Sequence, residues 1–204
     1  MDLSPRLRGA SAEGVAYWPG NKDNPPEILF GTGHGLLIAV NAETDKPASC
    51  FGTDGIVDLK VGMKDKLPGV HYGLSSAPVV YKNLVLTGSH TQDSPGLGSK
   101  GDLRAWDART GKLVWTFHAV LLPGEPGHET WIDGGWKGPS GVNAWTAFSL
   151  DAETGTVFVP FDCPAYDFYG GDRKGDNLFG NTVVVIDAQT GKMKWYFQTV
   201  HHDI

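Results

Sequence analysis

One segment of this chain occurs twice, and it constrains the fold more than any other feature of the sequence. Residues 101–117 read GDLRAWDARTGKLVWTF, and residues 181–197 read NTVVVIDAQTGKMKWYF. A chain that repeats a short unit builds the same local structure more than once and packs the copies against each other. The identical positions are Asp107, Ala108, Thr110, Gly111, Lys112, Trp115 and Phe117, which recur as Asp187, Ala188, Thr190, Gly191, Lys192, Trp195 and Phe197.

Two weaker copies extend the pattern. Residues 41–46, Asn-Ala-Glu-Thr-Asp-Lys, keep part of the motif, with Ser49 in the place of the Trp and Phe51 in the place of the Phe. Residues 151–155, Asp-Ala-Glu-Thr-Gly, join two apolar runs but lack the Trp after the turn. The three copies that keep the Phe after the turn start at residues 41, 107 and 187, so 66 and 80 residues separate them. Each interval has room for a four-stranded sheet and long loops.

The repeated unit has the pattern of a hairpin that carries a large apolar plate. Asp at the start of the turn accepts backbone N–H groups, and Gly at its end adopts positive φ. The Trp on the second strand is a flat side chain that docks between neighbouring sheets. Small sheets with one docking Trp each predict blades of a β-propeller. Two or three blades fit in this length, so we expect residues 1–204 to form a single, partial propeller domain.

Short strand signals separated by turns run along the whole chain, as an all-β fold requires. The 28 Gly and 13 Pro residues provide many turns, and 40% apolar residues provide a core. Lys82-Asn83 predicts a tight hairpin turn, and no segment has a long amphipathic helix pattern. The predicted strands are 27–31, 36–41, 78–81, 84–88, 102–107, 113–118, 145–151, 156–161, 181–187 and 193–198.

A glycine-rich segment at residues 31–35, Gly-Thr-Gly-His-Gly, is similar to a nucleotide-binding loop. In such a loop a third Gly would stand at position 36 and a helix would follow, whereas here Leu36 begins an apolar strand. We therefore interpret residues 31–35 as a hairpin turn.

Charge and composition exclude several classes of protein. The net charge is −6 with no basic run, which argues against a nucleic-acid partner. The sequence contains no stretch of about 18 apolar residues, so no membrane-spanning helix is predicted. The N-terminus has no apolar signal core. Cys50 and Cys163 either pair in an oxidising compartment or remain thiols, and we favour free thiols.

The repeat resembles the tryptophan-docking motif of the quinoprotein dehydrogenases, which are eight-bladed propellers that hold pyrroloquinoline quinone (PQQ) and a divalent metal on the central axis. Further segments resemble this family in the family's order, several of them its glucose- and sugar-type branch. The resemblance implies about three blades of such a propeller, with PQQ and calcium or another divalent metal as cofactors. The segments are residues 14–20, 116–120, 123–125, 127–131, 167–173 and 198–203.

The resemblance implies roles for four residues. Trp145 falls where the family places the stacking floor for PQQ; taken alone, it would be a core Trp opening the strand 145–151. Ser75 matches a position that hydrogen-bonds a cofactor carboxylate, and His90 a position that contacts the cofactor. Asp93 stands where the family has a carboxylate metal ligand, a hard oxygen donor. Each of the last three is otherwise an ordinary polar loop residue. If the roles hold, Ser75, Asp93 and Trp145 face one axial cavity, within about 15 Å of each other.

Two positions depart from the family pattern. Glu13 stands where the family usually has a cofactor-contacting Arg. Cys163 falls where some members have an Asn metal ligand, and a thiol is a poor ligand for calcium. Asp162 is next to it, but strand alternation would direct its side chain to the opposite side. In the family the general base comes after the run that ends at Ile204, so we expect no catalytic residue in this chain and no dehydrogenase activity from it alone.

The activity implied by the resemblance is oxidation of a sugar, polyol or alcohol hydroxyl by hydride transfer to PQQ. Electrons would pass to a quinone or a cytochrome, in the periplasm, with or without attachment to the membrane. The alternative is a non-enzymatic propeller scaffold of the outer-membrane assembly type, which shares the Trp repeat but has no cofactor site. The long segment 118–145 favours the enzyme, because a scaffold has little use for it.

Overall fold

The computed structural model describes residues 14–63, 71–94 and 96–203, and Glu13 and Ile204 lie outside them. The described chain is almost entirely β-structure in three four-stranded antiparallel sheets. Sheet I has the order β1 (Ala16–Trp18), β2 (Glu27–Gly31), β3 (Leu36–Asn41) and β4 (Ile56–Asp58). Sheet II has the order β6 (Val79–Tyr81), β7 (Leu84–Thr87), β9 (Leu103–Asp107) and β10 (Leu113–Phe117). Sheet III has the order β11 (Ser149–Asp151), β12 (Thr156–Phe161), β13 (Thr182–Asp187) and β14 (Met193–Gln198).

The remaining elements are short. Strands β5 (Tyr72–Gly73) and β8 (His90–Thr91) pair with each other. Two 3₁₀ helices, η1 (His128–Thr130) and η2 (Ile132–Lys137), lie in the segment between sheets II and III. In the described part of the chain no helix is long and apolar enough to cross a membrane.

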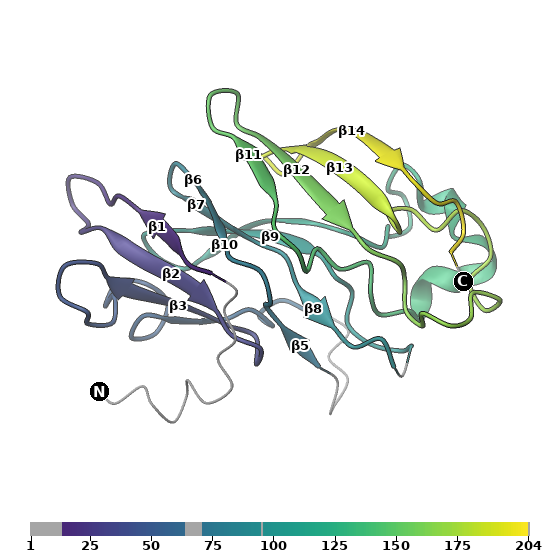
Figure 1. The fold of residues 1–204 in the computed structure, drawn as a ribbon, viewed down its shortest axis with the longest axis horizontal. Coiled ribbons are helices and arrows are strands. Elements are labelled where there is room, and N and C mark those ends of the chain that lie inside the picture. The colour runs from purple at the N-terminus through teal and green to yellow at the C-terminus, as the bar shows by residue number, and fades with distance from the viewer. Residues whose placement is uncertain (1–13, 64–70, 95, 204) are drawn as a thin grey trace.

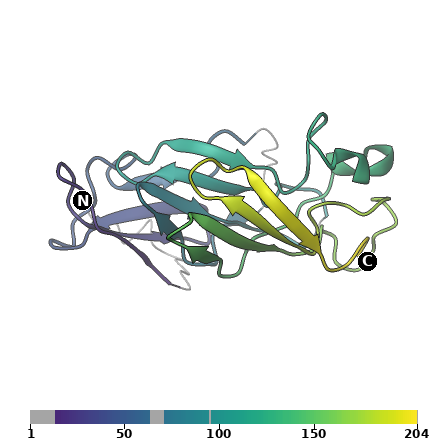
Figure 2. The same cartoon turned by 90° about the horizontal axis from the view of Figure 1, so that it is seen from above.

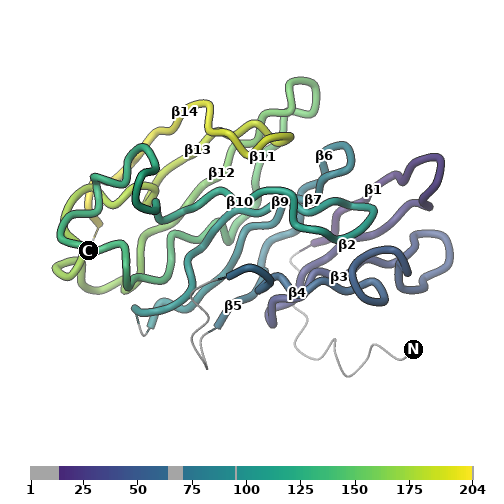
Figure 3. The backbone as a smooth tube through the Cα atoms, turned by 180° about the vertical axis from the view of Figure 1, so that it is seen from behind, coloured from purple at the N-terminus to yellow at the C-terminus, as the bar shows by residue number. Residues whose placement is uncertain are grey.

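The three sheets follow one another in space in the order of the sequence. Figures 1 and 3, seen from opposite sides, show sheets I, II and III side by side, with the helices near the C-terminal end. Figure 2 shows the same helices beyond the ends of the strands, on the side where the chain reaches its C-terminus. The predicted all-β, partial propeller is thus confirmed, with three blade-like sheets.

Strand alternation explains why both faces of sheet II are buried. In β7, Val85 points into a core shared with sheet I, whereas Leu84 and Leu86 point into a core shared with sheet III. In β9, Trp106 lies in the first core, and Leu103 and Ala105 lie in the second. Successive side chains of a strand point to opposite faces, so a strand that is apolar at every position belongs between two other sheets.

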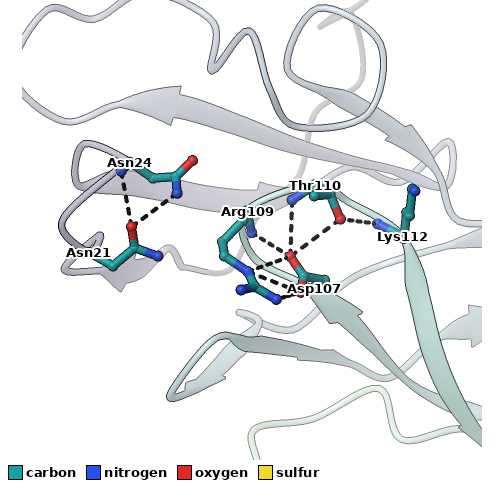
Figure 4. Close-up of polar contacts among 6 residues, drawn as sticks. All are labelled: Asn21, Asn24, Asp107, Arg109, Thr110 and Lys112. Atoms are coloured by element: carbon teal, nitrogen blue, oxygen red, sulfur yellow. Dashed lines mark hydrogen bonds and ion pairs between the residues drawn. The ribbon is translucent and has the colours of Figure 1, made fainter.

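The repeated turn has the geometry that the sequence predicts. Asp107 Oδ1 accepts the backbone N–H groups of Arg109 (2.9 Å) and Thr110 (3.1 Å), and the Arg109 guanidinium pairs with the same carboxylate (Figure 4). Thr110 Oγ1 accepts the N–H of Lys112 at 3.3 Å. Asp187 and Thr190 form the equivalent contacts in sheet III.

Trp115 is the docking side chain between sheets II and III. Its indole N–H donates to the Ala188 carbonyl at 3.3 Å, and its ring lies over Gly191. A Cβ at residue 191 would stand 2.7 Å from Trp115 Cδ2, and Gly191 has φ +71°. The glycine of each repeat is therefore needed for the turn and also to receive the preceding sheet.

Other docking contacts between the sheets place different side chains on the same glycine position of the repeat. At the junction of sheets I and II, Val57 and the Gly52 backbone pack on Gly111, and Gly52 N donates to Thr110 O at 3.0 Å. Gly155, in the copy that lacks a Trp, receives the phenol of Tyr81. The turn of this copy is thus also a docking site, on which a Tyr packs instead of a Trp.

Trp195 does not dock in this chain, contrary to the sequence-based expectation. Its side chain is 52% exposed and meets Phe158 edge-on, because no described segment covers the outer side of β14. In an intact ring of blades we expect the loss of either Trp to be strongly destabilising, but the burial that this requires of Trp195 is absent from the described residues.

The predicted strands agree with the structure apart from one. The strand predicted at 145–151 begins at Ser149, so Trp145 precedes it and does not open it. Residues 82–83 form the predicted tight turn between β6 and β7, and residues 31–35 connect the antiparallel strands β2 and β3 as predicted. The short strands β1, β4, β5 and β8 were not predicted, because two or three residues are too few to show a period.

Candidate functional site

The predicted site residues all follow or precede strands at one edge of the sheets. In an antiparallel sheet, the starts of the first and third strands and the ends of the second and fourth lie at the same edge, which we call the site edge. Ser75 precedes β6, His90 and Asp93 follow β7, and Trp145 precedes β11. Neighbouring sheets meet there, because Leu74 N donates to Thr32 O at 2.9 Å and Thr91 N to Asn143 Oδ1 at 3.1 Å.

Trp145 and Ser75 are in direct contact. Ser75 Oγ donates to the Trp145 carbonyl oxygen at 2.8 Å, and the Trp145 side chain is 43% exposed. Trp145 is thus not the core residue that its sequence context alone would suggest. The segment before it lies close on sheet II, since a Cβ at Gly88 would stand 1.9 Å from Ala144 O and a Cβ at Gly101 2.2 Å from Val142 O.

Asn143 joins three parts of the site edge and was not identified as a site residue from the sequence. Its Oδ1 accepts the N–H of Thr91 (3.1 Å) and the hydroxyl of Thr91 (3.0 Å), and its own N–H donates to the Asp162 carboxylate. The side chain is buried. Nothing in the local sequence distinguishes such an Asn from a surface one; only its hydrogen bonds to Thr91 and Asp162 do.

His34, His71 and His90 form a group of three histidines. The rings of His71 and His90 meet edge-on with centroids 5.2 Å apart. Burial lowers the pKa of His71, and the nearby charges of His90 and His34 lower it further. His34 comes from the turn 31–35, so this histidine group combines sheet I with the β5–β8 pair.

Asp93, Asp162 and Asp167 form an acidic group. Burial raises the pKa of Asp162 to about 7, and the charges of Asp167 and Asp93 add to this. The pKa of Asp167 is also raised, by burial first and then by Asp93. Asp93 itself is exposed. Within residues 14–63, 71–94 and 96–203, no three His, Cys, Asp or Glu side chains are arranged to hold a metal ion.

The alternation argument about Asp162 was wrong. Strand β12 ends at Phe161, so Asp162 and Cys163 lie in a loop where period two no longer applies. Cys163 Sγ donates to Asp167 Oδ1 at 3.5 Å. Burial raises the pKa of the Cys163 thiol to about 12, and the charges of Asp167 and Asp162 contribute. Cys50 and Cys163 are both free thiols.

Two buried serines at the site edge have hydroxyl groups without a partner. Ser76 and Ser89 are 3% and 0% exposed, and neither Oγ makes a hydrogen bond. Buried hydroxyl groups are nearly always hydrogen-bonded. In the chain they are the direct neighbours of Ser75 and His90.

A cavity of about 500 Å³ lies apart from these residues. Its lining includes Val61, Met63, Asp102, Arg104, His118 and Trp136, and none of the four predicted site residues. Arg104 is already bonded within this region, since its Nη1 donates to the Leu59 carbonyl at 2.7 Å.

Replacing Asp162 with Asn should stabilise the protein above pH 7 and leave it unchanged below pH 4. A carboxyl whose folded pKa (about 7) exceeds its unfolded value (3.8) binds more protons when folded, so stability falls as pH rises through this window and then levels off. We expect a gain of about 1–2 kcal/mol at pH 8 in urea unfolding, after solvent screening. Some pH dependence should remain, because burial also raises the pKa of Glu27 to about 7.

Asp151→Asn is the matched control, with the opposite sign. The Thr154 hydroxyl lowers the pKa of Asp151, so this carboxylate stabilises above its unfolded pKa and the benefit disappears as pH falls. The raised pKa of Asp162 is contradicted if the Asn variant loses as much stability between pH 4 and pH 8 as the unmodified protein does.

Blade-like sheets joined by docked aromatic side chains form a partial β-propeller domain, with an exposed Trp and two groups of titratable residues at one edge. Residues 2–204 match the family described as PQQ: glucose/ethanol/alcohol dehydrogenase, beta-propeller domain, and the chain belongs to this family. The predicted quinoprotein resemblance is thereby confirmed.

Known relatives agree with this family. The chain is 34% identical over 211 residues to the quinate/shikimate dehydrogenase (quinone) of Acinetobacter baylyi, covering 99% of this chain and 25% of the relative. It is 33% identical over 186 residues to quinoprotein glucose dehydrogenase A of Acinetobacter calcoaceticus, covering 88% and 22%. The solved quinohemoprotein alcohol dehydrogenase of Comamonas testosteroni has a TM-score of 0.75 at 28% identity, covering 95% of this chain and 28% of that one. The chain spans about a quarter of the length of these relatives.

Proposed function

We propose that this chain forms part of the PQQ-binding face of a dehydrogenase that oxidises a hydroxyl group of a sugar, polyol or alcohol. The observation that carries the proposal is the exposed Trp145 plate, with the histidine group at the same edge and the acidic group linked to it through Asn143. The names of the relatives, which include quinate, glucose, alcohol and glycerol dehydrogenases, support the reaction class.

The residues present fit PQQ, a planar molecule with three carboxylates. Trp145 offers a flat exposed surface on which such a ring stacks. His90 is partly exposed, and its ring N–H offers a donor to a carboxylate oxygen. Bound PQQ supplies the acceptor for the hydride that leaves the alcohol carbon. The Ser75 hydroxyl is already used on the Trp145 carbonyl, so we assign Ser75 to holding Trp145 in place.

The acidic group fits a divalent metal only in part. Asp93 is a hard oxygen donor of the kind that calcium prefers, and we propose it as a metal ligand. Asp167 lies near enough to raise the pKa of Asp162, but the described side chains do not form a coordination set as they stand. Cys163, with its raised pKa, is a neutral thiol and a poor ligand.

The partners and the compartment are part of the same proposal. Electrons would go to a quinone or a cytochrome, acceptors that appear in the names of two relatives. The periplasm, with or without membrane attachment, follows from the family resemblance. The scaffold alternative gains no support from the described structure, because the segment 118–145 ends in the exposed Trp145.

Trp145→Ala should weaken PQQ binding about 10- to 100-fold. Stacking of a planar ring on an aromatic side chain contributes about 1–3 kcal/mol. Binding is measured by equilibrium dialysis with and without CaCl₂, following PQQ absorbance. Trp195→Ala is the matched control, since Trp195 is similarly exposed but lies on β14 away from the site edge. Equal binding to the Trp145 variant and the unmodified protein would refute the stacking role, and no PQQ binding at all would refute the proposed function.

A further inference from the structure

The cavity of about 500 Å³ that Arg104 lines is formed where the end of sheet I meets sheet II. We call it the junction cavity. Its lining comes from residues 61–63, which follow β4, from Arg104 of β9 and Thr116 of β10, from the segment after β10, and from Trp136 of η2. None of the four residues predicted for the PQQ face is among them, so the proposed function leaves this cavity without a role.

Arg104 is a buried cation without an ion-pair partner. Its side chain is 4% exposed, Nη1 donates to the carbonyl oxygens of Leu59 (2.7 Å) and Val61 (3.3 Å), and Nε has no partner. No carboxylate of the described residues forms an ion pair with it, and the neighbouring Asp58 is paired with Lys60 at 3.3 Å. Buried charges in proteins are nearly always paired. The guanidinium therefore points to an anion that comes from outside the chain.

The other polar groups of the lining leave room for such an anion. Lys100 and His118 line the cavity as well, and Asp102 is the one acidic side chain among the described lining residues. Burial raises the pKa of Asp102, against the nearby charges of His118, Arg104 and Lys100, so this carboxyl group opposes an anion less than an exposed Asp would. Glu125, the nearby acid of the loop after β10, is already paired with His118 at 2.7 Å.

The rest of the lining is largely apolar. Leu113, Val120, Leu122 and Trp136 contribute aliphatic and aromatic surface. A ligand with an apolar body would bury this surface, which favours binding. A ring that carries several hydroxyl groups would instead lose hydrogen bonds to water without gaining enough partners.

We propose that the junction cavity binds a small monocarboxylate with an apolar body, whose carboxylate group pairs with Arg104. A guanidinium matches the two oxygens of a carboxylate better than any other side chain does. The inference goes beyond the proposed function and does not depend on it. Such a ligand would also join the two sheets, because Arg104 belongs to β9 and its partners Leu59 and Val61 follow β4.

The test is an NMR titration of the ¹⁵N-labelled chain, without PQQ, with ligands that differ in one feature. Phenylacetate is the probe. Phenylacetamide has its shape without the charge, acetate has the charge without the apolar body, and quinate is a carboxylate on a hydroxylated ring. We expect phenylacetate to shift the amide signals of Met63, Arg104 and Val120 with a Kd at or below about 1 mM. The other three should bind at least about 10-fold more weakly.

Two substitutions should change phenylacetate binding in opposite directions. Arg104→Gln should weaken it about 10- to 100-fold. Asp102→Asn removes the acidic group of the lining and should tighten binding about 3-fold or more, while its amide oxygen can still accept the N–H of Ala119. An unfolded variant cannot imitate a tighter site, so Asp102→Asn decides the test even if Arg104→Gln does not fold. Glu153→Gln, which changes the charge equally in the exposed β11–β12 turn, should have no effect.

Three results would overturn the inference. The first is phenylacetamide, acetate or quinate binding as tightly as phenylacetate, which would remove the need for the charge, for the apolar body or for a ring without hydroxyl groups. The second is phenylacetate-induced shifts that lie outside the cavity or do not occur at about 10 mM ligand. The third is weaker phenylacetate binding by the Asp102→Asn variant, because the cavity would then not favour an anion.

Discussion

Alanine at position 115 should lower the free energy of unfolding by about 3 kcal/mol. The Trp115 ring covers Gly191 and its indole N–H is bonded to Ala188 O. Its removal leaves a cavity between sheets II and III and an unpaired carbonyl. Urea unfolding followed by circular dichroism measures the change.

Trp195→Ala is the matched control for this prediction, because Trp195 occupies the same position of the repeat. It is 52% exposed, so its loss should cost less than about 1 kcal/mol in this chain. Equal costs for the two substitutions would show that the docking contact adds nothing beyond the strand itself. A Trp195 cost above that of Trp115 would mean that β14 is covered in solution.

Gly88→Ala should cost about 2–3 kcal/mol and should also displace Trp145. The added Cβ would stand 1.9 Å from Ala144 O and 3.0 Å from Phe148 Cζ, and the first of these atoms belongs to the backbone. The segment in front of β11 must therefore move. We expect a shift of Trp fluorescence and a loss of PQQ binding together with the loss of stability.

Gly124→Ala separates this steric clash from backbone strain. Gly124 has φ +94° but no atom within 4 Å of an added Cβ, so its substitution tests strain alone, which costs about 1 kcal/mol. Unchanged PQQ binding in the Gly88 variant would show that the position of Trp145 does not matter for the cofactor.

The sequence predicts where the four candidate residues lie in the fold better than it predicts their contacts. Ser75, His90, Asp93 and Trp145 come from motifs at strand ends, and antiparallel pairing places such positions at one edge. Their roles in the cofactor site stay predictions. The resemblance assigned Ser75 to the cofactor, whereas its hydroxyl contacts the Trp145 carbonyl. A hydroxyl partner 70 residues away in the chain cannot be deduced from local pattern.

The direction of the Asp162 side chain could not be predicted either, because it depends on where strand β12 ends. Period-two alternation would have directed Asp162 away from Cys163, but β12 stops at Phe161 and both residues are near Asp167. Ends of elements are set by tertiary contacts as much as by propensity. Here Asn143 donates to the Asp162 carboxylate and stabilises it after the strand.

The sequence by itself determined the repeat, the turn chemistry and the all-β class, because these depend on neighbours within a few residues. Asp107 and Thr110 form the turn in the way that their spacing predicts. Only the tertiary structure decided which of two identical motif positions docks: Trp115 packs on Gly191 of the next sheet, whereas among the described residues Trp195 packs on no such glycine. Burial and docking are properties of what packs against a residue, and that partner lies in a different part of the chain.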